Sequence, residues 1–132
     1  MTEEAEVELA GTGAAILLGG LLVFQLALAR GAPWGEASWG GRHSGVLPAH
    51  LRIASLVAGG VIYPLAILTV LDGAGVVDLG WPNPGPVTMW VITGLFVLAT
   101  VMNLASPSRR ERLWAGPAIS IAILCAVIAL NM

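Results

Sequence analysis

Four apolar runs dominate this chain, and each is long enough to cross a membrane as a helix. They extend over residues 9–29, 53–71, 87–104 and 113–130. A helix rises about 1.5 Å per residue, so roughly 20 residues cross a hydrocarbon core about 30 Å thick. The runs are apolar on every side, whereas a helix of a soluble protein is polar along one face. We therefore expect an all-α, polytopic membrane protein with four transmembrane helices in an up-down-up-down bundle.

The composition agrees with that expectation. Hydrophobic residues make up 57% of the 132 residues and charged residues 11%, compared with about 25% charged residues in soluble domains. The segments between the runs are short, so we expect one transmembrane domain over residues 1–132 and no nucleic-acid partner. The acidic N-terminus lacks the basic segment of a secretory signal, which predicts that the first run is retained.

The basic residues predict the orientation of the bundle. All six are arginines, and they fall only in the first and third connections between runs, at Arg30, Arg42, Arg52, Arg109, Arg110 and Arg112. Basic residues remain on the cytoplasmic side of a membrane protein. We therefore expect a multi-pass protein of the cell membrane in which loops 30–52 and 105–112 are cytoplasmic. Both termini are then extracytoplasmic.

The third connection carries a helix start. Ser108 and Glu111 have the spacing of a capping box, in which each side chain accepts a hydrogen bond from the other's backbone N–H. The fourth helix should therefore begin before the fourth apolar run. Its first turn would place Arg109, Arg110 and Arg112 against anionic lipid headgroups, each contributing about 1 kcal/mol of attraction. The lipid bilayer is thus the first partner that we expect.

The first connection is the longest and is rich in glycine. Five glycines interrupt regular structure between residues 31 and 45, and Trp34 and Trp39 lie among them. Tryptophan favours the membrane interface because its apolar ring carries one polar N–H. We expect this loop to lie along the lipid headgroups.

Two prolines interrupt the apolar runs. Pro64 and Pro117 cannot donate a backbone hydrogen bond, so the carbonyl groups of Gly60 and Leu113 lose their helical partners. We expect a kink at both places. A static kink repaired by neighbouring helices is one interpretation, and a broken helix that exposes backbone to a transported solute is the other.

Polar residues within the runs are few, and none is ionisable near neutral pH. Those of most interest are Gln25, Tyr63, Thr93 and Asn103. We interpret them as hydrogen-bonding contacts between helices. Because proton relays and ion pathways require ionisable groups in the membrane, the runs argue against a proton-coupled pump. If the four residues converged on one cavity near Pro64, they would instead favour a transporter.

Reactive side chains gather only at the predicted cytoplasmic face, where the chain carries Glu36, Arg42, His43, His50 and Arg52. The two histidines are seven residues apart, too far for paired ligands on one helix, and no H-E-x-x-H or cysteine pair accompanies them. We predict no metal site and no cofactor, and a haem would need ligands from a second protein. An enzyme would require Glu36, His43 and His50 to meet within hydrogen-bond reach.

Small residues recur at four-residue spacing in the runs, as at Gly11, Ala15 and Gly19. Helices in a membrane approach closely along such residues. The same pattern serves contacts within the bundle, between copies of the chain, or with another membrane protein.

Two motifs carry a resemblance to a known group of proteins. They are Ala-Pro-Trp-Gly-Glu-Ala-Ser-Trp-Gly-Gly at residues 32–41, followed by Gly-Val-Leu-Pro at 45–48, and Met-Asn-Leu-Ala-Ser at 102–106 with Glu111-Arg112. With these motifs the chain resembles uncharacterised small four-span integral membrane proteins of high-GC Gram-positive bacteria. The resemblance covers nearly the whole chain, and it implies no activity, cofactor or catalytic residue.

Three functions are compatible with these features. The first is a non-enzymatic accessory subunit of a larger membrane complex, or a scaffold that associates with itself. The second is a small oligomeric transporter or channel for an apolar or weakly polar solute. The third is a lipid-active or haem-binding protein with its site at the cytoplasmic face. We favour the first, because the apolar runs lack ionisable groups.

Overall fold

The computed structural model describes residues 1–82 and 84–132, and all regular structure within them is helical apart from one isolated bridge between Trp34 and Gly45. In chain order the elements are α1 (Glu3–Ala29), the 3-10 turns η1 (Gly35–Ala37) and η2 (Trp39–Gly41), α2 (Ala49–Val57), the π-turn η3 (Ala58–Ile62), α3 (Tyr63–Gly73), α4 (Pro86–Leu104), α5 (Arg109–Arg112) and α6 (Ala115–Leu130).

Four helical segments are long and apolar enough to cross a membrane within the described part of the chain: Glu3–Ala29, Ala49–Gly73, Pro86–Leu104 and Arg109–Leu130. Each of the four apolar runs lies within one of them. The first helix extends further than its run because Thr2 caps it, with the hydroxyl accepting a hydrogen bond from the Ala5 N–H at 3.1 Å. The acidic N-terminal residues therefore belong to the first turns of α1, where the helix dipole favours negative charge.

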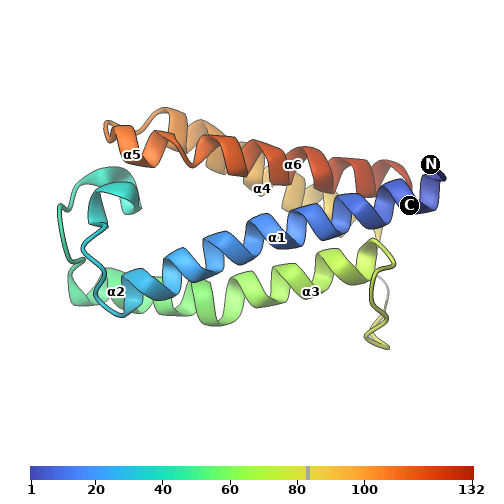
Figure 1. The fold of residues 1–132 in the computed structure, drawn as a ribbon, viewed down its shortest axis with the longest axis horizontal. Coiled ribbons are helices and arrows are strands. Elements are labelled where there is room, and N and C mark those ends of the chain that lie inside the picture. The colour runs from blue at the N-terminus through green and yellow to red at the C-terminus, as the bar shows by residue number, and fades with distance from the viewer. Residues whose placement is uncertain (83) are drawn as a thin grey trace.

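The helices alternate in direction, and α1 lies between α6 on one side and the α2–α3 segment on the other (Figure 1). α1 packs against α2, η3 and α3 on one side and against α6 on the other, and α4 packs mainly against α6. The N- and C-termini lie at the same end (Figure 1). The first and last helices thus join two antiparallel hairpins into one bundle.

The tightly packed core fills the half of the bundle near the termini. Its fully buried side chains include Leu18 of α1, Val70 of α3, Met89 of α4 and Ile121 of α6. Gly11 lies against Ala74 so closely that a Cβ on this glycine would collide with the alanine side chain. Gly19 has no such neighbour, so a small-residue contact within the bundle forms at Gly11, whereas a contact of Gly19 with another chain stays a prediction.

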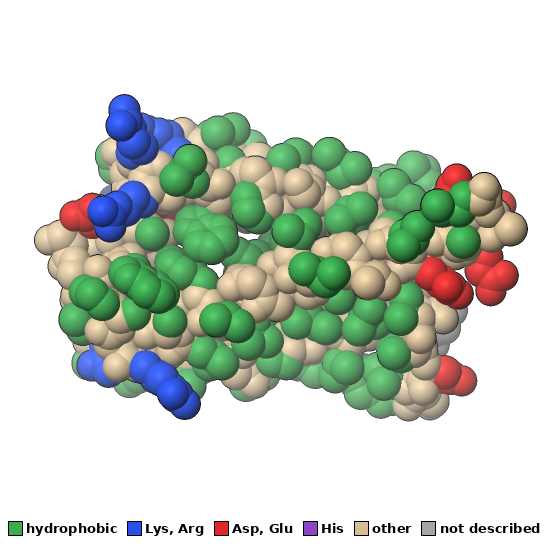
Figure 2. Space-filling view, viewed as in Figure 1, with side chains coloured by type: hydrophobic (Ala, Val, Ile, Leu, Met, Phe, Trp, Pro, Cys, Tyr) green, Lys and Arg blue, Asp and Glu red, His purple; other side chains and the backbone are tan. Residues whose placement is uncertain are grey.

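The arginines gather at one end of the bundle and most of the acidic side chains at the other, with apolar side chains between them (Figure 2). The arginines occupy the end formed by loops 30–48 and 105–114, which we call the Arg-rich end. The end that holds the termini carries the acidic residues of α1 and of the 72–78 segment, and we call it the acidic end.

Both expected helix irregularities occur in the turn before a proline. In the second segment the π-turn η3 precedes Pro64, and the Tyr63 N–H donates to the Ala58 carbonyl. In the fourth segment the helix is interrupted at Leu113 and Trp114, and the Gly116 N–H donates to the Leu113 carbonyl at 3.4 Å. The interruptions arise because proline lacks the N–H that would continue the regular hydrogen-bond ladder.

Candidate functional site

A cavity of about 250 Å³ lies inside the half of the bundle near the Arg-rich end. All the long helical segments contribute to it, and η1, η2 and their flanking residues also line it. We call it the central cavity, and its polar and aromatic lining consists of Phe24, Gln25, Ser38, Trp39, Tyr63, Phe96, Asn103, Glu111 and Trp114. It is the part of the molecule where side chains capable of binding a solute come together.

Three of the four polar residues singled out in the apolar runs line this cavity: Gln25, Tyr63 and Asn103. The fourth, Thr93, does not, because its hydroxyl donates to the Met89 carbonyl of the preceding turn at 2.9 Å. The Oε1 atom of Gln25 is buried and has no hydrogen-bond partner. A buried acceptor without a partner is costly, so this oxygen favours a ligand that can donate a hydrogen bond.

Glu111 is the residue that sequence reasoning missed. Its side chain is 7% exposed and lines the central cavity, and its Oε2 atom accepts a hydrogen bond from the Gly40 N–H at 2.9 Å. The capping box forms only in part. The Glu111 N–H donates to the Ser108 hydroxyl at 3.3 Å, whereas the Ser108 N–H donates to the Ser106 hydroxyl instead of the Glu111 carboxylate. The carboxylate is consequently free to turn inward.

The electrostatics of the central cavity follow from Glu111. Its carboxylate is the one acidic group among the described lining residues, which include no arginine, lysine or histidine. The carboxylate accepts a hydrogen bond from an uncharged donor, the Gly40 N–H, and a cation in the cavity would add a charged partner. The cavity is therefore suited to a positively charged ligand.

Five of the eight aromatic residues of the chain line the same cavity. Phe24 contacts Trp114 with ring centroids 4.6 Å apart, and it stacks on Trp34 at 6.2 Å with the ring planes nearly parallel. The Trp39 Nε1–H donates to the hydroxyl of the buried Ser55 at 3.0 Å. Aromatic faces attract cations, which adds to the effect of the carboxylate.

The first loop closes the Arg-rich end of the cavity by folding onto α5. The Ser108 hydroxyl donates a hydrogen bond to the Glu36 carbonyl, and Gly41 packs directly on Ser108. Gly41 has a φ of 69°, a conformation that glycine adopts without strain. The loop is thus a structured cap over the bundle, and its expected position along the headgroups stays a prediction.

A second opening of about 440 Å³ lies outside the cap, between the end of α4 and residues 39–42. It shares Trp39, Ala99, Asn103 and Glu111 with the central cavity. We call it the outer groove. These shared residues form the partition between the cavity and the surface at the Arg-rich end.

The cytoplasmic-face cluster expected from the sequence is only partly brought together. Glu36 and Arg42 line a surface depression of about 410 Å³ together with Arg109 and Arg110. His50 is exposed in the first turn of α2, and His43 is half-buried with an unpartnered Nδ1. Among the described residues, no hydrogen bond joins the side chains of Glu36, His43 and His50.

The remaining arginines stabilise turns or face outward. Arg112 donates from Nη1 to the carbonyls of Ser106 and Pro107, at 3.0 and 3.3 Å, so it holds the turn that precedes α5. Arg52 donates from Nε to the Ala29 carbonyl at 3.2 Å. Arg109 and Arg110 are exposed. In residues 1–82 and 84–132 no group of three or more histidine, cysteine, aspartate or glutamate side chains is placed to hold a metal ion.

Comparison of the chain with protein-family models, with curated proteins and with solved structures finds no match.

Proposed function

We propose that the protein is a multi-pass protein of the cell membrane that takes up a small organic cation in the central cavity, as a transporter does. The Arg-rich end faces the cytoplasm and the acidic end faces outward. The single observation that carries the proposal is the buried carboxylate of Glu111 in an aromatic-lined cavity without a cationic side chain.

The chemistry of the lining supports a cation over the apolar or weakly polar solute of the alternative transporter function considered from the sequence. A carboxylate attracts a cation by charge, aromatic faces attract it through their quadrupoles, and Gln25 offers an unused hydrogen-bond acceptor. The packed core beyond the cavity separates it from the acidic end. This arrangement fits a solute site with access from one side at a time better than it fits an open channel.

Binding of tetramethylammonium provides the first test. We expect this cation to raise the unfolding temperature of the purified protein in neutral detergent, because a ligand that binds only the folded state stabilises it. Sodium at equal ionic strength and the uncharged tert-butyl alcohol should have much smaller effects. Proteoliposomes should also take up labelled tetramethylammonium faster than protein-free vesicles do.

The substitution Glu111→Gln should weaken tetramethylammonium binding at least about tenfold, because it removes the charge but keeps an acceptor for the Gly40 N–H. Asp72→Asn is the matched control. Asp72 also accepts a backbone hydrogen bond, from the Leu79 N–H at 3.2 Å, but it lies at the acidic end. An equal loss of tetramethylammonium binding in the two variants would contradict the proposal and favour an accessory or scaffold role. The same conclusion would follow if the wild-type protein showed no preference for tetramethylammonium over sodium.

A further inference from the structure

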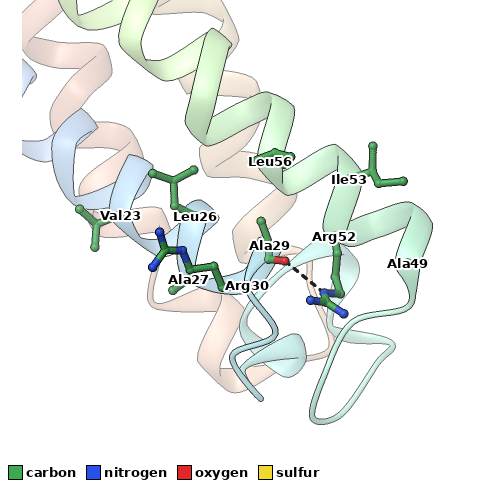
Figure 3. A pocket seen from close by; sticks show the side chains of 9 residues that line it. All are labelled: Val23, Leu26, Ala27, Ala29, Arg30, Ala49, Arg52, Ile53 and Leu56. Atoms are coloured by element: carbon green, nitrogen blue, oxygen red, sulfur yellow. Dashed lines mark hydrogen bonds between the residues drawn. The ribbon is translucent and has the colours of Figure 1, made fainter.

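A groove of about 730 Å³ runs between the C-terminal end of α1 and the start of α2, on the outer surface of the bundle. Figure 3 shows two arginines from different helices at this groove, Arg30 after the end of α1 and Arg52 on α2. The rest of its lining is apolar and consists of Val23, Leu26, Ala27, Ala29, Ala49, Ile53 and Leu56. The groove is separate from the central cavity and shares no lining residue with it.

Two arginines, whose guanidinium groups extend to different sides of Ala29, give the groove its positive charge (Figure 3). Arg52 donates from Nε to the Ala29 carbonyl at 3.2 Å, which fixes the guanidinium and leaves its terminal nitrogens free to donate (Figure 3). Arg30 is the C-cap residue of α1. A cation is favoured there by the negative end of the helix dipole. No acidic residue lines the groove within the described part of the chain, and guanidinium groups bind phosphate through paired hydrogen bonds.

The apolar walls identify the kind of anion. Val23 is 65% exposed, Ile53 62% and Leu56 55%, and all three lie within about two helical turns of an arginine. Three alanines leave space between these larger side chains. A free phosphate ion would contact only the arginines, whereas a phospholipid would fill the apolar part of the groove as well.

We propose that this groove binds one anionic phospholipid, with its headgroup between the guanidinium groups of Arg30 and Arg52 and an acyl chain along Val23 and Leu56. The position of the arginines at the Arg-rich end assigns the lipid to the leaflet that this end faces. Basic pockets at the ends of membrane helices favour anionic headgroups. The inference requires a bilayer around the helices, but it does not depend on cation binding in the central cavity.

The test measures lipid binding to the full chain in neutral detergent. Dioleoylphosphatidylglycerol should bind with a preference of about 30-fold over dioleoylphosphatidylcholine, equivalent to about 2 kcal/mol for two arginines. Glycerol phosphate, which has the anion but no acyl chain, should not compete at similar concentrations. Competition by glycerol phosphate at the concentration of the lipid would identify an anion site and overturn the lipid assignment.

Two single substitutions separate the headgroup from the acyl chain. Arg30→Gln should remove most of the preference for phosphatidylglycerol. Leu56→Trp should weaken the binding of both lipids, because the larger side chain fills the groove while the arginines remain. Both side chains are exposed, so the fold should tolerate the changes. Arg109→Gln with Arg110→Gln is the matched control, because it removes two exposed arginines at the same end.

The control variant should keep the 30-fold preference. If the control and Arg30→Gln lost the preference for phosphatidylglycerol equally, surface charge alone would account for lipid binding, and the proposed site would be overturned. Wild-type affinity in Leu56→Trp would overturn the placement of the acyl chain.

Discussion

At the scale of single residues, Trp39 connects the cap over the Arg-rich end to the interior of the bundle. Its φ of 49° lies in the left-handed region, which is unfavourable for a residue with a large side chain. The strain is offset by the hydrogen bond from its indole N–H to Ser55, a side chain that is 0% exposed. The contact therefore fixes the cap to α2.

A double-mutant cycle tests this contact. Trp39→Phe should lower the free energy of unfolding by about 1–3 kcal/mol, because the buried Ser55 hydroxyl loses its donor. Ser55→Ala should lower the free energy of unfolding by about 0.5–1.5 kcal/mol, since the partly exposed indole can then bond to water. In the double variant the two costs should be less than additive when unfolding is measured in detergent. Full additivity would show that the hydrogen bond contributes nothing.

The residues of the candidate site were predictable to different degrees. Gln25, Tyr63 and Asn103 are conspicuous because polar side chains are rare in an apolar run, and all three line the central cavity. Glu111 was not predictable, because its position among three arginines is typical of a helix start at a membrane surface. Only the folded first loop supplies the Gly40 N–H that holds its carboxylate inside.

At the scale of helical elements, the π-turn η3 determines how closely the second segment approaches α1. Gly59 faces α1, and a Cβ added to it would lie 3.0 Å from the Leu26 side chain and 3.1 Å from the Leu22 carbonyl oxygen. The neighbouring Gly60 has nothing within 4 Å of the same position. Gly59 thus lies in the contact with α1, and the adjacent Gly60 lies outside it.

Alanine substitution should distinguish these two glycines. Gly59→Ala should lower the free energy of unfolding by about 1–3 kcal/mol, because the added methyl group overpacks the contact with α1. Gly60→Ala should be neutral or stabilising by up to about 1 kcal/mol, because alanine favours helix over glycine. Thermal or denaturant unfolding in detergent measures both. Equal costs for the two variants would show that the contact with α1 does not set the spacing.

At the scale of the whole molecule, the bundle has two different halves. The half near the acidic end is filled by packed side chains, and the half near the Arg-rich end holds the central cavity beneath a folded cap. The charges separate in the same direction (Figure 2). Under the proposed orientation, a solute would reach the cavity from the cytoplasmic side.

Cysteine labelling in intact cells tests this orientation. The native Cys125 is buried and should not react with a membrane-impermeant maleimide. Cysteine introduced by Met132→Cys should be labelled from outside, because the termini lie at the acidic end. Ser44→Cys, in the exposed cap, should be labelled only after the membrane is made permeable. The reverse pattern would place the arginines outside and overturn the orientation.

The sequence by itself determined the secondary structure and the separation of charge. Apolar runs of membrane length can satisfy their backbone hydrogen bonds in a bilayer only as helices, and Pro64 and Pro117 within the runs each cause an irregular turn. These are local effects that depend on residues near one another in the chain. They determine where along the chain each helix lies, but they do not specify which side chains meet across the bundle.

Only the tertiary structure decided the character of the central cavity. Its lining comes from segments as far apart in the chain as Leu21 and Trp114. The Gly40–Glu111 hydrogen bond joins residues 71 positions apart. Such contacts depend on how the first loop folds over the bundle, because a carboxylate at a helix start can equally well face water. The charge of the cavity, and with it the class of solute that it suits, follows from that one long-range contact.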